Sequence, residues 1–121
     1  MTEKISSKPV YDLDERTFIF AKNVRLFIKT LPYSIANEED GRQLIKSSGS
    51  VGANYREANE SLSKKDFLMR VKISRKEAKE SSYWLRLIHE TNSISNREAK
   101  KLCKESIELK KILSSIIEKS K

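Results

Sequence analysis

The sequence predicts an all-α protein that folds as an antiparallel, up-and-down four-helix bundle. Its 121 residues include only two prolines and three glycines, too few for an all-β fold with many tight turns. Four segments each carry an apolar stripe at alternating steps of three and four residues, which is a helix period. Because the connections between them are short, we expect neighbouring helices to run antiparallel and to bury their stripes against one another.

The first helix is expected from about Asp14 to Thr30. It follows a polar lead-in of residues 1–12, which we expect to be flexible. Asp14 and Glu15 suit a helix N-terminus, where acidic side chains complement the exposed N–H groups. Pro32 ends the helix, because the residue before a proline is pushed out of helical geometry. The apolar stripe consists of Phe20, Val24, Phe27 and Leu31, widened by Phe18, Ala21 and Ile28.

The second and third helices are expected at about 38–59 and 64–91. Asn37 is the predicted N-cap of the second. Ser63 is the predicted N-cap of the third, and Asp66 resembles the acidic member of a capping box. The stripe of the second helix is Leu44, Ser48, Val51, Tyr55 and Ala58; that of the third is Phe67, Val71, Ser74, Ala78, Ser81, Leu85 and Ile88.

The fourth helix is expected at about 96–118. Ser95 is its predicted N-cap, with Glu98 three residues later. Its stripe is Leu102, Ser106, Leu109, Leu113 and Ile116. The four helices together form one predicted domain, residues 13–121, which is long enough to bury a hydrophobic core.

Composition narrows the function classes. The formal net charge of +8 favours polyanionic partners such as nucleic acid. No apolar run approaches the roughly 20 residues that a membrane span needs, and the first residues lack the apolar core of a signal peptide. Cys103 is the single cysteine, so no intrachain disulfide can form. We therefore expect a cytoplasmic protein that does not bind membranes.

The stretch SSGSVGANYREA, which begins at Ser47, is unusually rich in small, uncharged residues. A solvent-facing surface of this chain should carry lysine or glutamate, yet here small residues extend beyond the apolar stripe. Small residues allow another backbone to approach closely. Two interpretations remain open: tight packing against a neighbouring helix of the same bundle, or a contact between subunits. The residues concerned are Gly49, Ser50, Gly52 and Ala53.

The third helix carries the highest density of positive charge, with seven basic and two acidic residues from Lys64 to Lys79. Basic residues at seven-residue spacing lie opposite the apolar stripe, roughly 10 Å apart along the helix. They are either a solvated face or a row that binds phosphates. The candidate nucleic-acid-binding residues are Lys65, Lys72, Lys79 and Arg86, with Lys76 adjacent.

Polar residues of the second and third helices are candidates for a structural network. A pairing of Arg56 with Glu77 or Glu80 would fix the register of the helices or the pairing of subunits; the alternative is simple exposure to solvent. The candidate network consists of Asn54, Arg56, Glu57, Glu77 and Glu80.

Motifs for catalysis, metals or cofactors are missing from the sequence. A di-iron bundle needs two Glu-x-x-His motifs, but His89 is the single histidine and Arg86 precedes it by three residues. The same spacing excludes the Arg-to-His motif of HEPN-type ribonucleases. Cys103 has no second histidine to activate it, and we interpret it as a buried, inert thiol. We therefore expect neither an enzyme nor a bound metal or cofactor.

The central segment of the chain carries a distinctive pattern, SSGSVGANYREANESLSKKDFLMRVKISRKEAKESSYWLRL. Its characteristic residues are Ser50, Val51, Asn54, Glu57 and Ala58, followed by Ser63, Asp66, Phe67, Ala78, Glu80, Ser81, Tyr83, Trp84 and Leu85. In these residues the chain resembles the four-helix-bundle family of 23S rRNA intervening-sequence proteins. The chain is also similar to the accessory variability proteins of diversity-generating retroelements.

The resemblance implies an up-and-down bundle of bacterial origin whose relatives form pentameric rings. The retroelement proteins bind nucleic acid and a reverse transcriptase through a basic ring surface. We therefore expect a non-catalytic homo-oligomer, with a pentamer favoured, that binds structured RNA or DNA. The alternative is a protein-interaction adaptor or scaffold ring with no direct nucleic-acid role.

Overall fold

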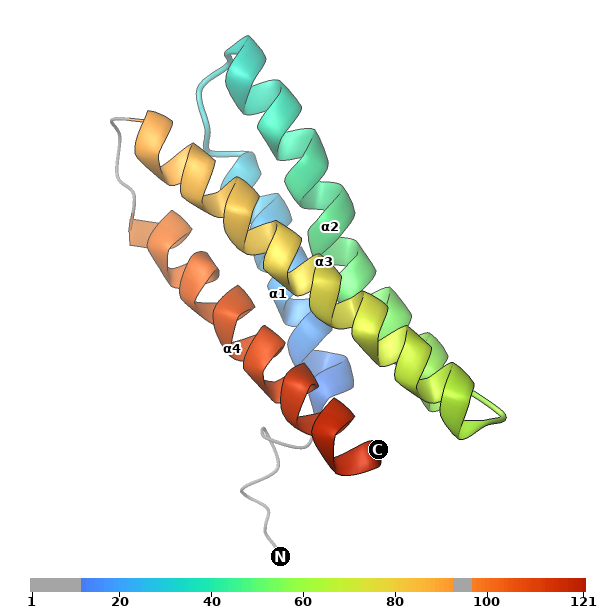
Figure 1. The fold of residues 1–121 in the computed structure, drawn as a ribbon. Coiled ribbons are helices and arrows are strands. Elements are labelled where there is room, and N and C mark those ends of the chain that lie inside the picture. Colours follow the sequence, from blue (N-terminus) through green and yellow to red (C-terminus); the bar gives the residue numbers. More distant parts are fainter. Residues whose placement is uncertain (1–11, 93–96) are drawn as a thin grey trace, which may run out of the picture.

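The computed structural model describes residues 12–92 and 97–121, which form four helices. These are α1 (Leu13–Ile28), α2 (Ile35–Asn59), α3 (Lys64–Thr91) and α4 (Arg97–Ser120). Successive helices run antiparallel and pack side by side, and α1 also contacts α4, so the bundle closes on itself (Figure 1). The described residues contain no strand. The predicted all-α four-helix bundle is confirmed.

The first two helices begin earlier than predicted. Asp12, assigned to the lead-in, is the N-cap of α1, and its carboxylate accepts a hydrogen bond from the Glu15 N–H at 3.1 Å. Ser34 caps α2 and accepts from the Asn37 N–H at 3.0 Å. The prediction of Asn37 as N-cap is therefore wrong, because Ser34 already occupies the cap in extended backbone geometry.

Asn37 instead connects two parts of the fold. Only 7% of it is exposed, and its side-chain amide exchanges two hydrogen bonds of 2.9 Å with Asn92, at the end of α3. Its Nδ2 also donates to the Pro32 carbonyl at 3.0 Å. A buried amide is stable only when it is hydrogen-bonded in this way. The pair therefore joins the α1–α2 connection to the far end of α3.

The cap of α3 is confirmed, since the Ser63 hydroxyl accepts from the Asp66 N–H at 3.1 Å. The predicted cap of α4, Ser95, lies outside the described residues. The apolar stripes form the core, with two corrections. Phe18 is 55% exposed and does not widen the stripe of α1. In α4 the step after Leu113 is four residues, so Ile117 is buried and Ile116 only partly so.

Serines in the stripes and directly beside them allow α3 to pack closely against both of its neighbours. The Ser74 hydroxyl donates to the Val51 carbonyl of α2 at 2.6 Å, and the Ser47 and Ser81 hydroxyls lie 2.9 Å apart. On the other side, the Ser82 and Ser106 hydroxyls connect α3 and α4 at 2.6 Å. A buried hydroxyl needs such a partner. These bonds fix the register of three helices.

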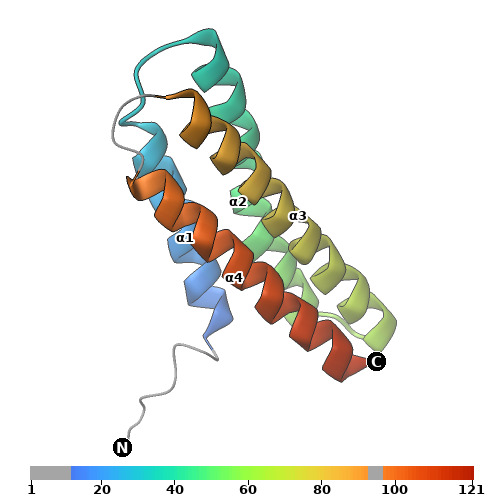
Figure 2. The ribbon, with the colours of Figure 1, turned by 60° about the vertical axis from the view of Figure 1, so that its left-hand side comes forward.

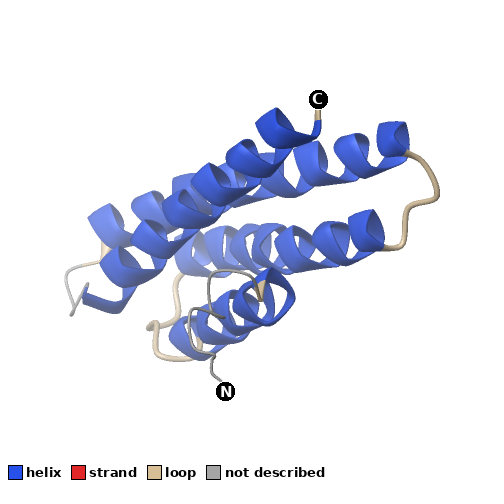
Figure 3. Ribbon diagram, turned by 90° about the horizontal axis from the view of Figure 1, so that it is seen from below, coloured by secondary structure: helices blue, strands red, loops and turns tan. Residues whose placement is uncertain are grey.

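α1 is much shorter than its neighbours, with 16 residues against 28 in α3. Figure 1 and Figure 2 show α2 and α3 extending beyond the start of α1 towards the loop that connects them. Seen from below, the helices run across the picture, and α1, next to the N label, lies at the edge of the bundle beyond α2 (Figure 3). The outer face of α3 is thus far from α1 and free of any covering helix.

Candidate nucleic-acid interface

The basic row of α3 lies on the outside of the bundle. Its members are all exposed: Lys65, Lys72, Lys76, Lys79 and Arg86. Within the described part of the chain, the four lysines form no ion pair, whereas Arg86 binds Glu90 through Nε at 3.1 Å. Unpaired ammonium groups remain free to bind phosphates. The sequence therefore predicted the exposure of this row correctly, and its role in binding stays a prediction.

The row continues across the seam between α3 and α4. Arg75 Nη1 donates to the Ser114 hydroxyl at 3.4 Å, and Ser82 meets Ser106 about two turns further along α3. Lys79 lies between Arg75 and Ser82 in the sequence, and Lys110 lies midway between the two α4 serines. Both lysines are exposed. The register of the two helices therefore places basic side chains on both sides of the seam.

The small residues of α2 allow close packing against α1. A Cβ added to Gly52 would lie 2.9 Å from Thr17 Oγ1 and 3.2 Å from Thr17 Cβ. A Cβ on Gly49 would lie 3.2 Å from Arg25 Nη2. Packing within one bundle therefore accounts for Gly52, whereas the atom close to Gly49 is the end of a flexible side chain that can move aside. Ser50 is half-buried and Ala53 is exposed, so these two remain available for a contact between subunits.

The predicted pairing of Arg56 with Glu77 or Glu80 is wrong. Arg56 Nε instead donates to Asp14 Oδ1 of α1 at 2.7 Å, and this hydrogen bond raises the pKa of Arg56. The reason is geometric: Arg56 follows Gly52 by one helical turn, and Gly52 faces α1. The side chain therefore points towards α1 and not towards α3.

Asn54 does connect α2 and α3, but its partner is Arg70. Arg70 Nη1 donates to Asn54 Oδ1 at 3.1 Å, and Asn54 Nδ2 donates to the Ser50 carbonyl at 2.9 Å. Glu57 and Glu80 are exposed and Glu77 is half-buried. Of the predicted network, only Asn54 makes a hydrogen bond between α2 and α3 in the described residues, and a role in subunit pairing stays a prediction.

Cys103 and His89, the two side chains considered for catalysis or metal binding, are both half-buried. Burial raises the pKa of the Cys103 thiol, and the nearby charge of Arg86 opposes this shift. Less thiolate is present at neutral pH as a result, which suits an inert cysteine. His89 lies in the last turn of α3, and its Nδ1 is buried without a hydrogen-bond partner among the described residues, as is Trp84 Nε1.

Tyr83 and Trp84 contact each other although they are adjacent. Their ring centroids lie 5.0 Å apart at an interplanar angle of 78°, an edge-to-face arrangement. Trp84 packs against the core, and Tyr83 is exposed. The pair does not form a flat platform for stacking bases.

In residues 12–92 and 97–121, no three His, Cys, Asp or Glu side chains converge in a way that could hold a metal ion. None of the described helices is both long enough and apolar enough to cross a lipid bilayer.

Two features that sequence reasoning missed connect distant parts of the chain. Arg16 and Glu105 form a bidentate ion pair between α1 and α4, with distances of 2.7 and 2.9 Å. The hydrogen bond to Glu105 raises the pKa of Arg16, against a smaller effect of burial. The second feature is the amide pair of Asn37 and Asn92. No local sequence pattern predicts either pair, because Arg16 and Glu105 are 89 residues apart and Asn37 and Asn92 are 55 residues apart.

Comparisons with known proteins agree with the resemblance seen in the sequence. A family model described as 23S rRNA-intervening sequence protein matches residues 12–115. A solved structure is similar over 86% of this chain and 96% of its own, with a TM-score of 0.76 and 30% identity. It is described as a protein of unknown function from the S23 ribosomal protein family of Bacteroides thetaiotaomicron. A comparison with curated proteins found no match. The chain belongs to the 23S rRNA-intervening sequence protein family.

Proposed function

We propose that this protein is a non-catalytic nucleic-acid-binding protein that contacts phosphates through the outer face of α3. The observation that carries the proposal is the row of exposed lysines that form no ion pair with any described carboxylate. Lys110 and Arg75 extend this positive surface onto the seam with α4. Such a surface suits a backbone of regularly spaced phosphates.

Structured RNA is the polyanion to test first. The description of the family names an intervening sequence of 23S rRNA, and this name is the reason to test RNA before DNA. Lysines on a helix are point charges that bind phosphates without reading bases. We therefore propose recognition of RNA shape and backbone, with weak dependence on base sequence.

The test compares two variants of equal charge. In the first, Lys65, Lys72 and Lys79 of α3 are changed to Glu. In the control, three exposed lysines that form no ion pair with a described carboxylate are changed to Glu: Lys22 of α1, Lys29 directly after α1, and Lys46 of α2. Each variant has a formal net charge of +2, because three reversals remove six charges from +8.

Binding to a fluorescent RNA hairpin and to a duplex DNA is then measured by anisotropy at near-physiological salt. We expect the α3 variant to lose at least tenfold more affinity than the control. Equal losses would show that net charge alone attracts the RNA, and the proposal for α3 would be wrong. Absence of binding by the unmodified protein would favour the alternative, a protein-interaction adaptor.

We also propose that the bundle assembles into a homo-oligomer, with a pentamer favoured by the resemblance described above. Assembly would repeat the α3 row around a ring and raise its affinity through multivalency. Sedimentation equilibrium should then give a mass about five times the 14.0 kDa of one chain. Replacing the exposed Ala53 by Arg tests the remaining small-residue contact and should lower this mass if α2 forms the interface.

A further inference from the structure

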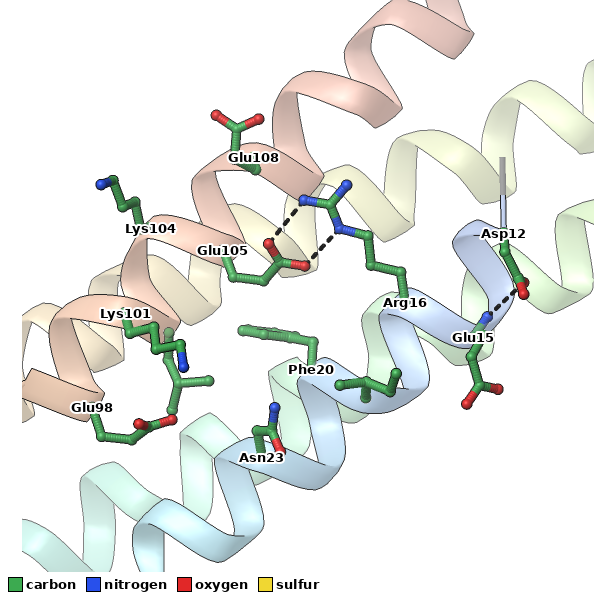
Figure 4. A pocket seen from close by; sticks show the side chains of 12 residues that line it. Asp12, Glu15, Arg16, Phe20, Asn23, Glu98, Lys101, Lys104, Glu105 and Glu108 are labelled. Carbon is green, nitrogen blue, oxygen red and sulfur yellow. Dashed lines mark hydrogen bonds and ion pairs between the residues drawn. The ribbon is translucent and has the colours of Figure 1, made fainter. Parts of the chain in front are cut away.

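A groove of about 870 Å³ runs between α1 and α4 (Figure 4). Its bottom is formed by the edges of the buried Phe20 and Leu102, and one wall by Ile19, which is 42% exposed. Figure 4 shows the ion pair of Arg16 and Glu105 bridging the two helices beside the ring of Phe20. The volume lies in the range of protein binding pockets, about 300–1,000 Å³.

Exposed apolar surface continues from the groove along α1. Leu26 follows Ile19 by seven residues, so both lie on the same side of the helix, and Leu26 is 51% exposed. Two large apolar side chains at heptad spacing are the pattern that one helix presents to another. This part of the surface therefore matches the face of an additional helix.

The rim of the groove has the opposite charge to the protein as a whole. The lining residues include five carboxylates and three cations, in a chain with 25 basic and 17 acidic residues. One cation, Arg16, is already bound by Glu105, and the negative charge of Glu108 further raises its pKa. Apart from this ion pair, the rim carries four carboxylates and two lysines. Its net negative charge repels phosphates and attracts cationic groups, which argues against nucleic acid as the occupant.

We propose that this groove binds an amphipathic helix of a partner protein, with an apolar stripe flanked by lysine or arginine. The stripe would pack on Ile19 and Leu26 and across the opening above Phe20. Its basic flanks would meet the carboxylates of the rim, among them Glu15 and Glu108. An amphipathic helix in an apolar groove is a common mode of recognition, and it uses the shape and the charge seen here.

The probe for the test is a fluorescent model peptide of about 18 residues, with leucine at the helix-period positions and lysine elsewhere. A second peptide has the same leucines with glutamate in place of lysine. The protein is strongly basic, so general electrostatics would favour the glutamate peptide. We expect the lysine peptide to bind more tightly. This result would show that the groove, and not the net charge of the protein, determines which peptide binds.

Two protein variants identify the site. The groove variant combines two substitutions. Ile19→Lys places a positive charge on the apolar wall, and Glu108→Lys reverses a negative charge of the rim. Both positions are exposed. The matched control is Ile107→Lys with Glu39→Lys, since Ile107 is also 42% exposed and lies outside the groove. We expect the groove variant to bind the lysine peptide at least tenfold more weakly and the control to bind as before.

Equal binding by both variants, or tighter binding of the glutamate peptide, would overturn the proposal. A second copy of the chain is the other possible occupant. In that case the groove variant lowers the mass measured by sedimentation and the unmodified protein does not bind the lysine peptide, a result that also contradicts the proposal. Because the RNA test uses α3 variants, its failure leaves this result unaffected.

Discussion

The two sides of α1 are packed in opposite ways. Towards α2, Gly52 allows Thr17 to approach so closely that no Cβ fits between them. Towards α4, long side chains span the gap, with Arg16 and Glu105 as the hydrogen-bonded bridge and a groove beside it. One helix thus forms a closed seam and an open one.

The difference shows how residue size decides which surfaces remain available. Small residues bring two backbones together and leave no room for a partner. Long charged residues hold the helices apart, and their stems surround an apolar hollow that is accessible from solvent. The closed seam should therefore control stability, and the open seam should tolerate change and accept ligands.

Filling the closed seam should give the largest effect. Gly52→Leu places a side chain where Thr17 lies, and overpacking of this kind costs about 1–3 kcal/mol of unfolding free energy. The control is Ala53→Leu at the next, exposed position, where leucine has nearly the helix propensity of alanine and fills no packed space, so stability should stay unchanged. Urea unfolding measures both. Equal stability of the two variants would contradict the closed packing.

Thiol reactivity should separate the open α1–α4 groove from the packed contact of α3 with α4 by at least tenfold in rate. Cys103 is half-buried between α3 and α4, and burial raises its pKa, so little thiolate is present at neutral pH. A cysteine introduced by Ile19→Cys, in a Cys103→Ser background, would line the open groove. We expect iodoacetamide to modify the introduced cysteine faster than Cys103 in the unmodified chain. Similar rates would mean that the groove is closed in solution.

The ion pairs of α1 should give the smallest effects. A double-mutant cycle for Arg16 and Glu105, both about 30% exposed, should show a coupling of about 0.5–1 kcal/mol that falls with salt. Arg56 and Asp14 are more exposed and should couple more weakly. A larger coupling energy for Arg56 and Asp14 than for Arg16 and Glu105 would show that partial burial does not strengthen the ion pair across the open seam.

The fold was predictable because each stripe encodes its helix locally. Alternating steps of three and four residues depend on no distant residue, and neither does the cap formed by Ser63 and the Asp66 N–H. Asn37 shows where local reasoning ends. Asparagine and serine both favour the N-cap position, so the sequence alone does not distinguish Ser34 from Asn37. In the structure Ser34 is the N-cap, and the side chain of Asn37 binds Asn92, 55 residues away.

The candidate site was predictable only in part, for the same reason. Exposure of the α3 lysines follows from their position opposite the apolar stripe. The partner of Arg56 does not, because a side chain on α2 can reach either α1 or α3, and helix rotation decides. The position of Lys110 beside the α3 row depends on the register of α3 and α4, which contacts such as Ser82 with Ser106 set. The groove beside Arg16 depends on the separation of α1 and α4, which no local pattern encodes.

The most direct test of the proposed function is the salt dependence of binding to the structured RNA hairpin, measured for the unmodified protein and for a variant with Lys65, Lys72 and Lys79 changed to Ala. Each phosphate contact contributes about 0.7–0.9 to the slope of log affinity against log salt concentration. If the three lysines each bind a phosphate, the slope should become less steep by about 2–3. An unchanged slope would show that the row is only a solvated face, and the central claim would be wrong.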